Sequence, residues 1–285
     1  NLLSADSVSL DVLALLMEYT GKLNNGVITG TFRQFGVAFP LELKAGDAGK
    51  PNRPQEPESP LGYKTEEVTF TNQKAHVSLA GTLTYPVNYT PDKKVPVVIM
   101  VTGSGAQNRD EEVFAHKPFR VIADYLAKQG IASLRYDDRG VGQSTGNQAG
   151  CTSADFAEDA ACGLSWLKSS GKFNQVGILG HSEGGLIAFM LGAEGKADFL
   201  VSMAGPGIKG DSLLVEQQNA LFKLKGIPSN MSVSTLRKSM ATQPGNVWLE
   251  YFMDYDPRPD LERITIPVMA VNGSNDMQVL SDSNI

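Results

Sequence analysis

The strongest constraint on the fold is an alternation of short apolar runs with helical patterns that starts near residue 95. The run VPVVIMV is unbroken and rich in β-branched residues, which is typical of a strand buried on both faces. Further strand-like runs occur at residues 131–136, 176–179, 199–203 and 266–271, and an antiparallel pair is expected before them at 67–72 and 77–85. Strands that alternate with helices predict an α/β fold, with a mostly parallel sheet and helices on both faces.

The helices of this region have recognisable start and stop signals. One has apolar residues at helical spacing from Phe119 to Leu126 and ends at Gly130. A second starts at Thr152, which forms a capping-box pattern with Asp155. These signals support the helical half of the alternation.

Before and within this region the pattern changes. Strand-like runs around the Asn25-Gly26 hairpin signal predict a partial antiparallel β domain of three or four strands at residues 1–47. A Pro-rich linker is expected at 48–62, because proline fixes φ and removes a backbone donor. The remaining α/β domain, 63–285, is interrupted at 207–262 by amphipathic segments, which predict a helical cap inserted between two sheet strands.

Composition excludes several classes of protein. A chain of 285 residues has room for about two domains of roughly 150 residues. Its 25 Lys and Arg against 31 Asp and Glu, without a basic run, disfavour nucleic acid or an anionic membrane as partner. No apolar run reaches the ~20 residues of a membrane span. Cys151 and Cys162 would lie ~16 Å apart along one helix, too far for a disulfide.

The most specific motif is GHSEG at residues 180–184, between the strand at 176–179 and a helix that starts at Glu183. A G-x-S-x-G in this context predicts a nucleophile elbow, in which the sharp turn exposes the hydroxyl of Ser182. The turn also leaves the N–H of Glu183 free, at a helix N-terminus, to stabilise an oxyanion. The alternative is a glycine-rich packing turn with a bystander serine.

The loop TGSG at residues 102–105 directly follows the buried strand at 95–101. In this architecture that loop supplies the second oxyanion-hole N–H, for which we favour Ser104, with Gly105 as second choice. A Gly-x-Gly after a buried strand also fits a dinucleotide-binding turn, but Asn108 occupies the third glycine position and no Lys-Ser/Thr follows for a P-loop.

Two more strand ends carry acidic residues. Asp276 lies just past the strand at 266–271. Enzymes that carry their nucleophile on such an elbow place the acid that orients the catalytic histidine at this position. The alternative is a turn aspartate bonded to its own backbone. In YDDRGVGQS, at 136–144, we expect an ion pair of Asp138 with Arg139 that fixes a loop, and Ser144 lacks an elbow.

These motifs together resemble the α/β-hydrolase family, and more narrowly a group of bacterial serine esterases with an N-terminal β domain. The matching stretches are GTFRQFGVAFPLEL, RPQEP, GTLTYP, VTGSGAQNRDE, HKPF, YDDRGVGQSTG, GHSEGG and NGSNDMQV. The resemblance implies hydrolysis of a small-molecule carboxylic ester through an acyl-enzyme, without a metal or organic cofactor. It leaves the natural ester, the acyl length and the oligomeric state open, and it favours the bacterial cell envelope or secretion only weakly.

A triad histidine after Asp276 is missing. Only nine residues follow it, fewer than the ~10–12 of a parallel crossover. His181 precedes Ser182, so we expect its side chain to pack away from the hydroxyl; His76 lies in the early antiparallel pair, and His116 lies beyond the oxyanion loop. We therefore expect a chain truncated at both ends and nearly inactive, since serine without a base is a poor nucleophile.

Alternatives to an esterase remain open. A thioesterase or peptidase could use the same scaffold, and the acidic pair Glu111 and Glu112 is the only hint of a site for a peptide amine. A non-catalytic binding module that kept the hydrolase frame is the rival from another class. The acyl pocket is expected to be walled by five residues of the cap, namely Leu221, Met240, Trp248, Tyr251 and Phe252.

Overall fold

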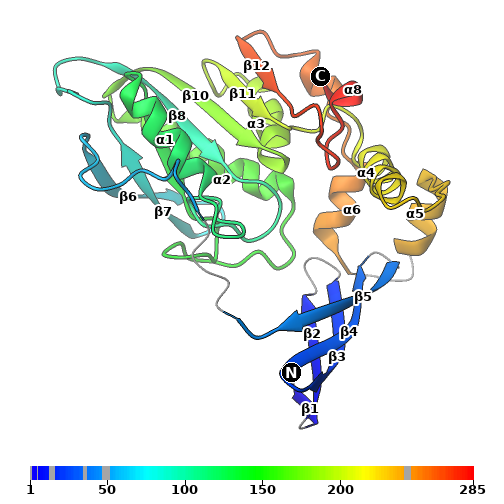
Figure 1. The fold of residues 1–285 in the computed structure, drawn as a ribbon. Coiled ribbons are helices and arrows are strands. Elements are labelled where there is room, and N and C mark those ends of the chain that lie inside the picture. Colours follow the sequence, from blue (N-terminus) through cyan, green and yellow to red (C-terminus); the bar gives the residue numbers. More distant parts are fainter. Residues whose placement is uncertain (1, 5, 13–16, 35–36, 47–51, 241–244) are drawn as a thin grey trace. The chain divides into compact units, whose positions relative to one another are not determined.

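The computed structural model describes residues 2–4, 6–12, 17–34, 37–46, 52–240 and 245–285. The chain divides into two compact units, residues 1–53 and 54–285 (Figure 1). Parts of three predictions lie outside the described residues: 1, 5, 13–16, 35–36 and 47 of the expected β domain, 48–51 of the expected linker and 241–244 of the expected cap.

The first unit is a five-stranded antiparallel sheet in the order β1-β2-β3-β4-β5. Its strands are β1 (Leu2–Ser4), β2 (Ser7–Val12), β3 (Met17–Asn24), β4 (Val27–Gln34) and β5 (Val37–Lys44). The short β1 was not expected from the sequence. Asn25 and Gly26 join β3 to β4 with φ of 48° and 78°, the positive values that a two-residue hairpin turn requires. The hairpin prediction is confirmed.

The second unit contains a seven-stranded sheet in the order β12-β11-β10-β8-β9-β7-β6. Its strands are β6 (Thr65–Asn72), β7 (Val77–Thr84), β8 (Val95–Val101), β9 (Ala132–Tyr136), β10 (Phe173–His181), β11 (Leu200–Met203) and β12 (Val268–Val271). The pairs β6–β7 and β7–β9 are antiparallel and all other pairs are parallel. The predicted α/β fold with an initial antiparallel pair is confirmed.

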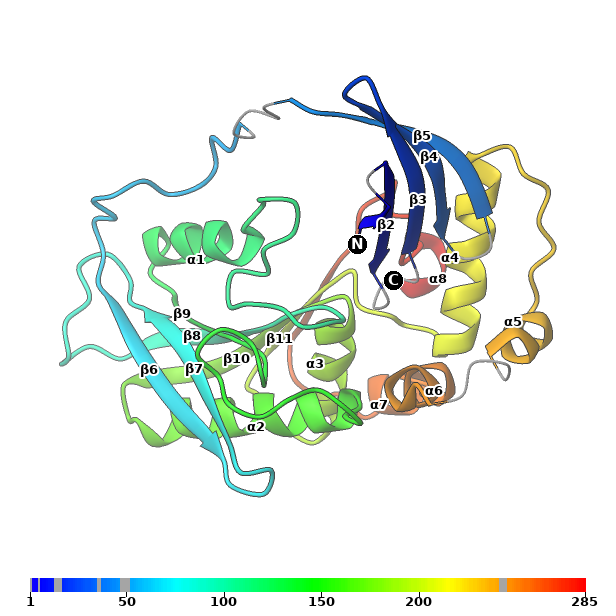
Figure 2. The ribbon, with the colours of Figure 1, turned by 90° about the horizontal axis from the view of Figure 1, so that it is seen from below.

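Helices cover both faces of this sheet, as Figures 1 and 2 show for α1 (Pro118–Lys128) against α2 (Ser153–Ser169) and α3 (Glu183–Ala193). Successive side chains of β8 alternate between the two layers. Val98 and Met100 pack in a cluster with Phe119 of α1, whereas Ile99 packs in the cluster that contains Leu164 of α2. The unbroken apolar run at 95–101 is therefore the consequence of a strand buried on both faces.

The predicted helical insertion lies between β11 and β12. It consists of α4 (Gly210–Leu224), α5 (Val233–Met240), α6 (Val247–Asp254) and α7 (Arg258–Leu261), and a short α8 (Ser281–Asn284) follows β12. Across the described part of the chain, no helix has the length and apolar character needed to cross a membrane. Both cysteines are free thiols, as expected.

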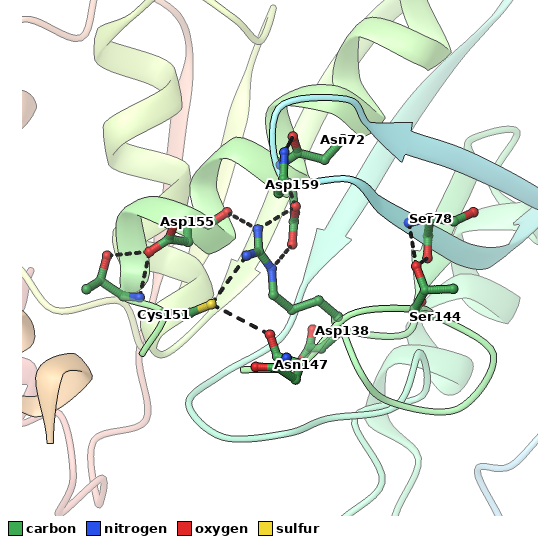
Figure 3. A network of polar contacts seen from close by, with 12 residues as sticks. Asn72, Ser78, Asp138, Ser144, Asn147, Cys151, Asp155 and Asp159 are labelled. Carbon is green, nitrogen blue, oxygen red and sulfur yellow. Dashed lines mark hydrogen bonds and ion pairs between the residues drawn. The ribbon is translucent and has the colours of Figure 1, made fainter. Parts of the chain in front are cut away.

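A buried polar network joins the loop after β9 to α2 and to the end of β6 (Figure 3). The Arg139 guanidinium donates to both carboxylate oxygens of Asp159, at 2.7 and 2.8 Å, and Asn72 donates to the same carboxylate at 2.7 Å. The prediction of an ion pair between Asp138 and Arg139 is wrong. Asp138 instead binds the loop after β8, because neighbouring residues at a strand end point to different sides.

Replacing Arg139 with methionine is expected to destabilise the protein by about 3 kcal/mol, because it leaves the buried carboxylate of Asp159 without its cation. The change shows as a lower urea midpoint at unchanged m value. Arg258→Met is the matched control: Arg258 also pairs with an aspartate, but its side chain is 64% exposed, so we expect little change in the midpoint. Equal midpoints for the Arg139 variant and the wild type would contradict the prediction.

Candidate active site

The expected bend is present at Ser182. β10 ends at His181 and α3 begins at Glu183, and Ser182 between them has φ 53° and ψ −117°, a conformation that L-residues rarely adopt. Its backbone N–H donates to the carbonyl of Met203, at the end of the neighbouring β11, at 2.9 Å. Strain of this kind persists only where the surroundings enforce it, and it concentrates at functional sites.

The glycines of the motif are required by close backbone contacts. A Cβ at Gly180 would lie 1.9 Å from the carbonyl oxygen of Gly184, and a Cβ at Gly184 would lie 2.1 Å from the carbonyl oxygen of Val101. A Cβ at Gly185 would lie 2.6 Å from the Cα of Gly205. The elbow therefore packs closely against the ends of β8 and β11, and these three glycine positions leave no room for a Cβ atom.

The loop after β8 lies directly against the serine. A Cβ at Gly103 would be 3.3 Å from the Cβ of Ser182. The N–H of Gly103 donates to Oε1 of Glu111 at 2.7 Å, and a role of the next amides, those of Ser104 and Gly105, in binding an oxyanion stays a prediction. The N–H of Glu183 lies in the first turn of α3, where backbone donors have no intrahelical acceptor.

Carboxylates hold this loop in place. Asp138 accepts from the hydroxyl of Thr102 and the N–H of Gln107, both at 2.9 Å, and Asp137 accepts from the N–H of Arg109 at 2.9 Å. Burial raises the pKa of Asp138 to about 7, and the nearby carboxylate charges add to the increase, while these two hydrogen bonds oppose it. Asp138 therefore titrates near neutral pH.

Because the pKa of Asp138 is raised in the folded state, its contribution to stability is complete below the ordinary value of 3.8 and is lost as pH rises through about 7. Asp138→Asn keeps an acceptor for Gln107 and stays neutral. We expect its free energy of unfolding to fall less between pH 5 and pH 8 than that of the wild type, as measured by urea titration at both pH values. The exposed control Asp92→Asn should keep the wild-type difference, and an unchanged difference in Asp138→Asn would refute the prediction.

A second buried carboxylate connects the elbow to the helical insertion. Glu183 is 2% exposed, and its Oε1 accepts from the hydroxyl of Ser153 on α2 at 2.5 Å and from the indole N–H of Trp248 on α6 at 2.7 Å. Burial raises the pKa of Glu183, while hydrogen bonds from Ser153, Trp248 and Ser104 oppose the increase. One side chain next to the serine thus binds the loop after β8, the core helix α2 and the insertion.

The five predicted pocket residues have different environments. Trp248 contacts the elbow through Glu183, and Phe252 is buried and stacks on Trp248 with ring centroids 5.3 Å apart. Tyr251 stacks on Tyr255, whereas Leu221 and Met240 are half-buried on α4 and α5. Contact of these residues with an acyl group stays a prediction.

Asp276 and Ser182 both follow the carboxyl ends of parallel strands of the sheet. β10, β11 and β12 are parallel neighbours, so the loops after β10 and β12 emerge at the same end of the strands. Oδ1 of Asp276 accepts from the N–H groups of Gln278 and Val279, at 2.8 and 3.0 Å, and so caps its own turn. The charge of Asp276 also contributes to raising the pKa of His181, which is consistent with a position near the elbow.

The three histidines are placed as follows. Nδ1 of His181 lies 2.8 Å from Oε1 of Glu111, a polar contact where packing was expected. This hydrogen bond raises the pKa of His181, and burial opposes the increase. His76 lies in the turn between β6 and β7, and His116 is exposed in the loop before α1.

Sequence reasoning missed two groups at this site. Glu111 was considered only as one of an acidic pair, and Ser153 was not considered. No short motif marks them, because both contact the elbow from segments more than 25 residues away in the sequence. Glu183 was expected to act through its N–H, and its side-chain contacts were not anticipated.

Comparisons with known proteins show which proteins this chain resembles. Residues 117–244 match the sequence profile of the serine aminopeptidase family S33. The esterase EstD of Thermotoga maritima is 30% identical over 231 residues, which cover 77% of this chain and 54% of EstD. The chain thus spans about half the length of this curated relative.

Solved structures show the same fold. An esterase of Pyrococcus furiosus is 20% identical, with a TM-score of 0.56 over 78% of this chain and 75% of its own. The α/β-hydrolase GrgF of Penicillium sp. sh18 is 18% identical, with a TM-score of 0.53 over 77% of this chain and 83% of its own. At these identities the likeness concerns the fold.

Proposed function

This chain is an α/β-hydrolase, and on that premise we propose that it is part of a serine hydrolase that cleaves small carboxylic esters through an acyl-enzyme on Ser182. The observation that carries the proposal is the strained serine between β10 and α3, with Gly103 packed against its Cβ. A hydroxyl on such a bend, beside backbone N–H groups, is the arrangement that acyl transfer requires.

In the proposed reaction, Oγ of Ser182 attacks the acyl carbon and its proton passes to a histidine. The N–H groups of Glu183 and of Ser104 or Gly105 stabilise the tetrahedral oxyanion; losing one such donor typically costs ~10²–10³ in rate. The intermediate collapses, the C–O bond to the alcohol breaks, and the histidine returns the proton to the alcohol. Water then releases the acid from the acyl-enzyme, with Asp276 orienting the histidine.

We place this histidine outside residues 1–285, on a segment that pairs with β12. The side chains of Val268, Met269 and Val271 on β12 are 48%, 59% and 43% exposed, and β12 is an edge strand of the sheet. Apolar edge strands of this kind are normally paired or covered. Among the hydrogen bonds of the described residues, the one made by the His181 ring goes to Glu111, and none joins the ring to the hydroxyl of Ser182.

In the same proposal, the insertion at 207–262 serves as a cap and lines the acyl pocket. Trp248 supports this role, because its indole N–H binds Glu183 next to the serine. An aromatic wall of Trp248 and Phe252 would suit an apolar acyl group.

A peptidase is the second candidate, because the matched family is named for an aminopeptidase activity. The structure weakens the one hint that favoured it. Glu111 is buried and its Oε1 binds Gly103 and His181, so this carboxylate is not exposed to a substrate amine. Comparing rates on p-nitrophenyl acetate and on aminoacyl amides separates the two activities.

The test of the proposal compares the 285-residue chain with one extended past Ile285 in its own reading frame. We expect the extended chain to hydrolyse p-nitrophenyl acetate and to react with a fluorophosphonate probe, and the shorter chain to do both far more slowly. Vigorous turnover by the shorter chain would overturn the placement of the histidine and would turn attention to His116. Absence of both reactions in the extended chain would overturn the proposal that the protein is a serine hydrolase.

A further inference from the structure

Glu111 is a buried carboxylate that the proposed reaction does not use. It lies in the loop between β8 and α1, is 4% exposed, and has φ 52°, a positive value that is uncommon for a residue other than glycine. Its N–H donates to the carbonyl of Asn108 at 2.8 Å, and the side-chain oxygen of Asn108 accepts from the N–H groups of Asp110 and Glu112. This tight turn fixes the backbone from which the Glu111 side chain projects.

One oxygen of Glu111 joins the two halves of the site. Oε1 accepts from the N–H of Gly103, just after β8, at 2.7 Å, and lies 2.8 Å from Nδ1 of His181, the last residue of β10. A Cβ at Gly103 would lie 3.4 Å from that oxygen, 3.4 Å from Nδ1 of His181 and 3.3 Å from the Cβ of Ser182. The carboxylate, the imidazole and the serine therefore meet around Gly103.

This contact fixes the direction of the peptide group between Thr102 and Gly103, at the start of the loop. With the Gly103 N–H turned to Glu111, the amide of Gly103 is removed from the oxyanion donors, and the start of the loop is held against the elbow. A hydrogen bond to a charged carboxylate is stronger than one between neutral groups, and it is shielded here from water by burial. The amides of Ser104 and Gly105 follow directly after this anchored peptide group.

We propose that Glu111 is a positioning residue of the ester hydrolase: its carboxylate, bound to Gly103 and His181, holds the oxyanion loop against the nucleophile elbow. The proposal rests on the proposed function. Two charged groups act on the Glu111–His181 pair: Asp276, from the loop after β12, adds to the increase in the pKa of His181, and Asp138 is close enough for the charge of Glu111 to raise its pKa.

The test uses two substitutions that remove different properties of the Glu111 side chain. Glu111→Gln keeps an oxygen that can accept from Gly103 but removes the charge, whereas Glu111→Ala removes both. In the extended chain we expect Glu111→Ala to lower kcat on p-nitrophenyl acetate about 10²-fold with little change in KM, the loss typical of a misplaced oxyanion donor. Glu111→Gln should lose less than about 10-fold. Glu112→Gln, at the exposed neighbouring position, is the matched control and should retain full activity.

A second measurement is independent of turnover. The imidazole of His181, one of only three in the chain, can be titrated by NMR in the 285-residue protein, and His181→Gln assigns its signal. We expect a pKa above the ordinary 6.5 in the wild type and a lower pKa in Glu111→Gln. A kcat of Glu111→Ala equal to that of the wild type, or a His181 titration unchanged by Glu111→Gln, would overturn the proposal. If the wild-type extended chain hydrolyses no ester, the proposed function fails, and the titration alone then decides whether Glu111 holds His181.

Discussion

Replacing Ser182 with alanine is expected to reduce ester turnover by the extended chain about 10⁴- to 10⁶-fold, because no other hydroxyl occupies the elbow. The structure gives the reason: the strained turn at Ser182 presents a side chain beside Gly103 and the N-terminus of α3, and alanine has no nucleophile to present. The measurement is the steady-state rate on p-nitrophenyl acetate, together with covalent labelling by a fluorophosphonate and identification of the labelled peptide.

The controls for this result come from two other serines. Ser165→Ala, on the exposed side of α2, should label at the wild-type rate. Ser144 donates to the carbonyl of Asp137 at 2.7 Å and accepts from the N–H of Ala80 at 2.9 Å, so its hydroxyl serves a structural role. Labelled peptide that contains Ser144, or a Ser182→Ala chain that keeps its turnover, would refute the assignment of the nucleophile.

Replacing Gly184 with alanine is expected to cost more than about 4 kcal/mol of unfolding free energy, a loss that few single substitutions reach. Its Cβ would lie 2.1 Å from the carbonyl oxygen of Val101 and 2.7 Å from that of Thr102. Both are backbone atoms at the end of the central strand β8, so neither can rotate out of the way. A large decrease in the urea midpoint, or failure to fold, is the expected observation.

Gly273→Ala is the matched control for the added methyl group. The nearest atoms to a Cβ at Gly273 lie 3.8 Å away, an ordinary van der Waals distance, so we expect a change within about 0.5 kcal/mol. Equal midpoints for the Gly184 variant and the Gly273 variant would show that the elbow is not wedged against β8 as described.

Much of the fold could be predicted from short sequence patterns. The apolar run at 95–101 predicted a doubly covered strand, and β8 packs between α1 and α2 as expected. Thr152 and Asp155 predicted a helix start, and the reciprocal capping bonds are present. These predictions succeeded because hydrophobic periodicity and capping depend on residues within a few positions of one another.

Long-range side-chain pairing was less predictable. Arg139 was expected to pair with Asp138, yet it binds Asp159, 20 positions further along, while Asp138 binds the loop after β8. Adjacency in sequence favoured the wrong pair, because side chains of neighbouring residues at a strand end diverge. The contact of Trp248 with Glu183 spans 65 positions and had no local signal.

The amino-acid sequence by itself determined the order of strands and helices, the bend that carries Ser182 and the strand end that carries Asp276. Each of these follows from chemistry confined to a few consecutive residues, namely apolar periodicity, glycine at crowded turns and helix capping. Only the tertiary structure decided which oxygen accepts a hydrogen bond from the Gly103 N–H, which carboxylate pairs with Arg139 and how the insertion contacts the elbow. Such contacts depend on the packing of whole helices and strands against one another, which brings distant residues within hydrogen-bond reach in a way that no local pattern encodes.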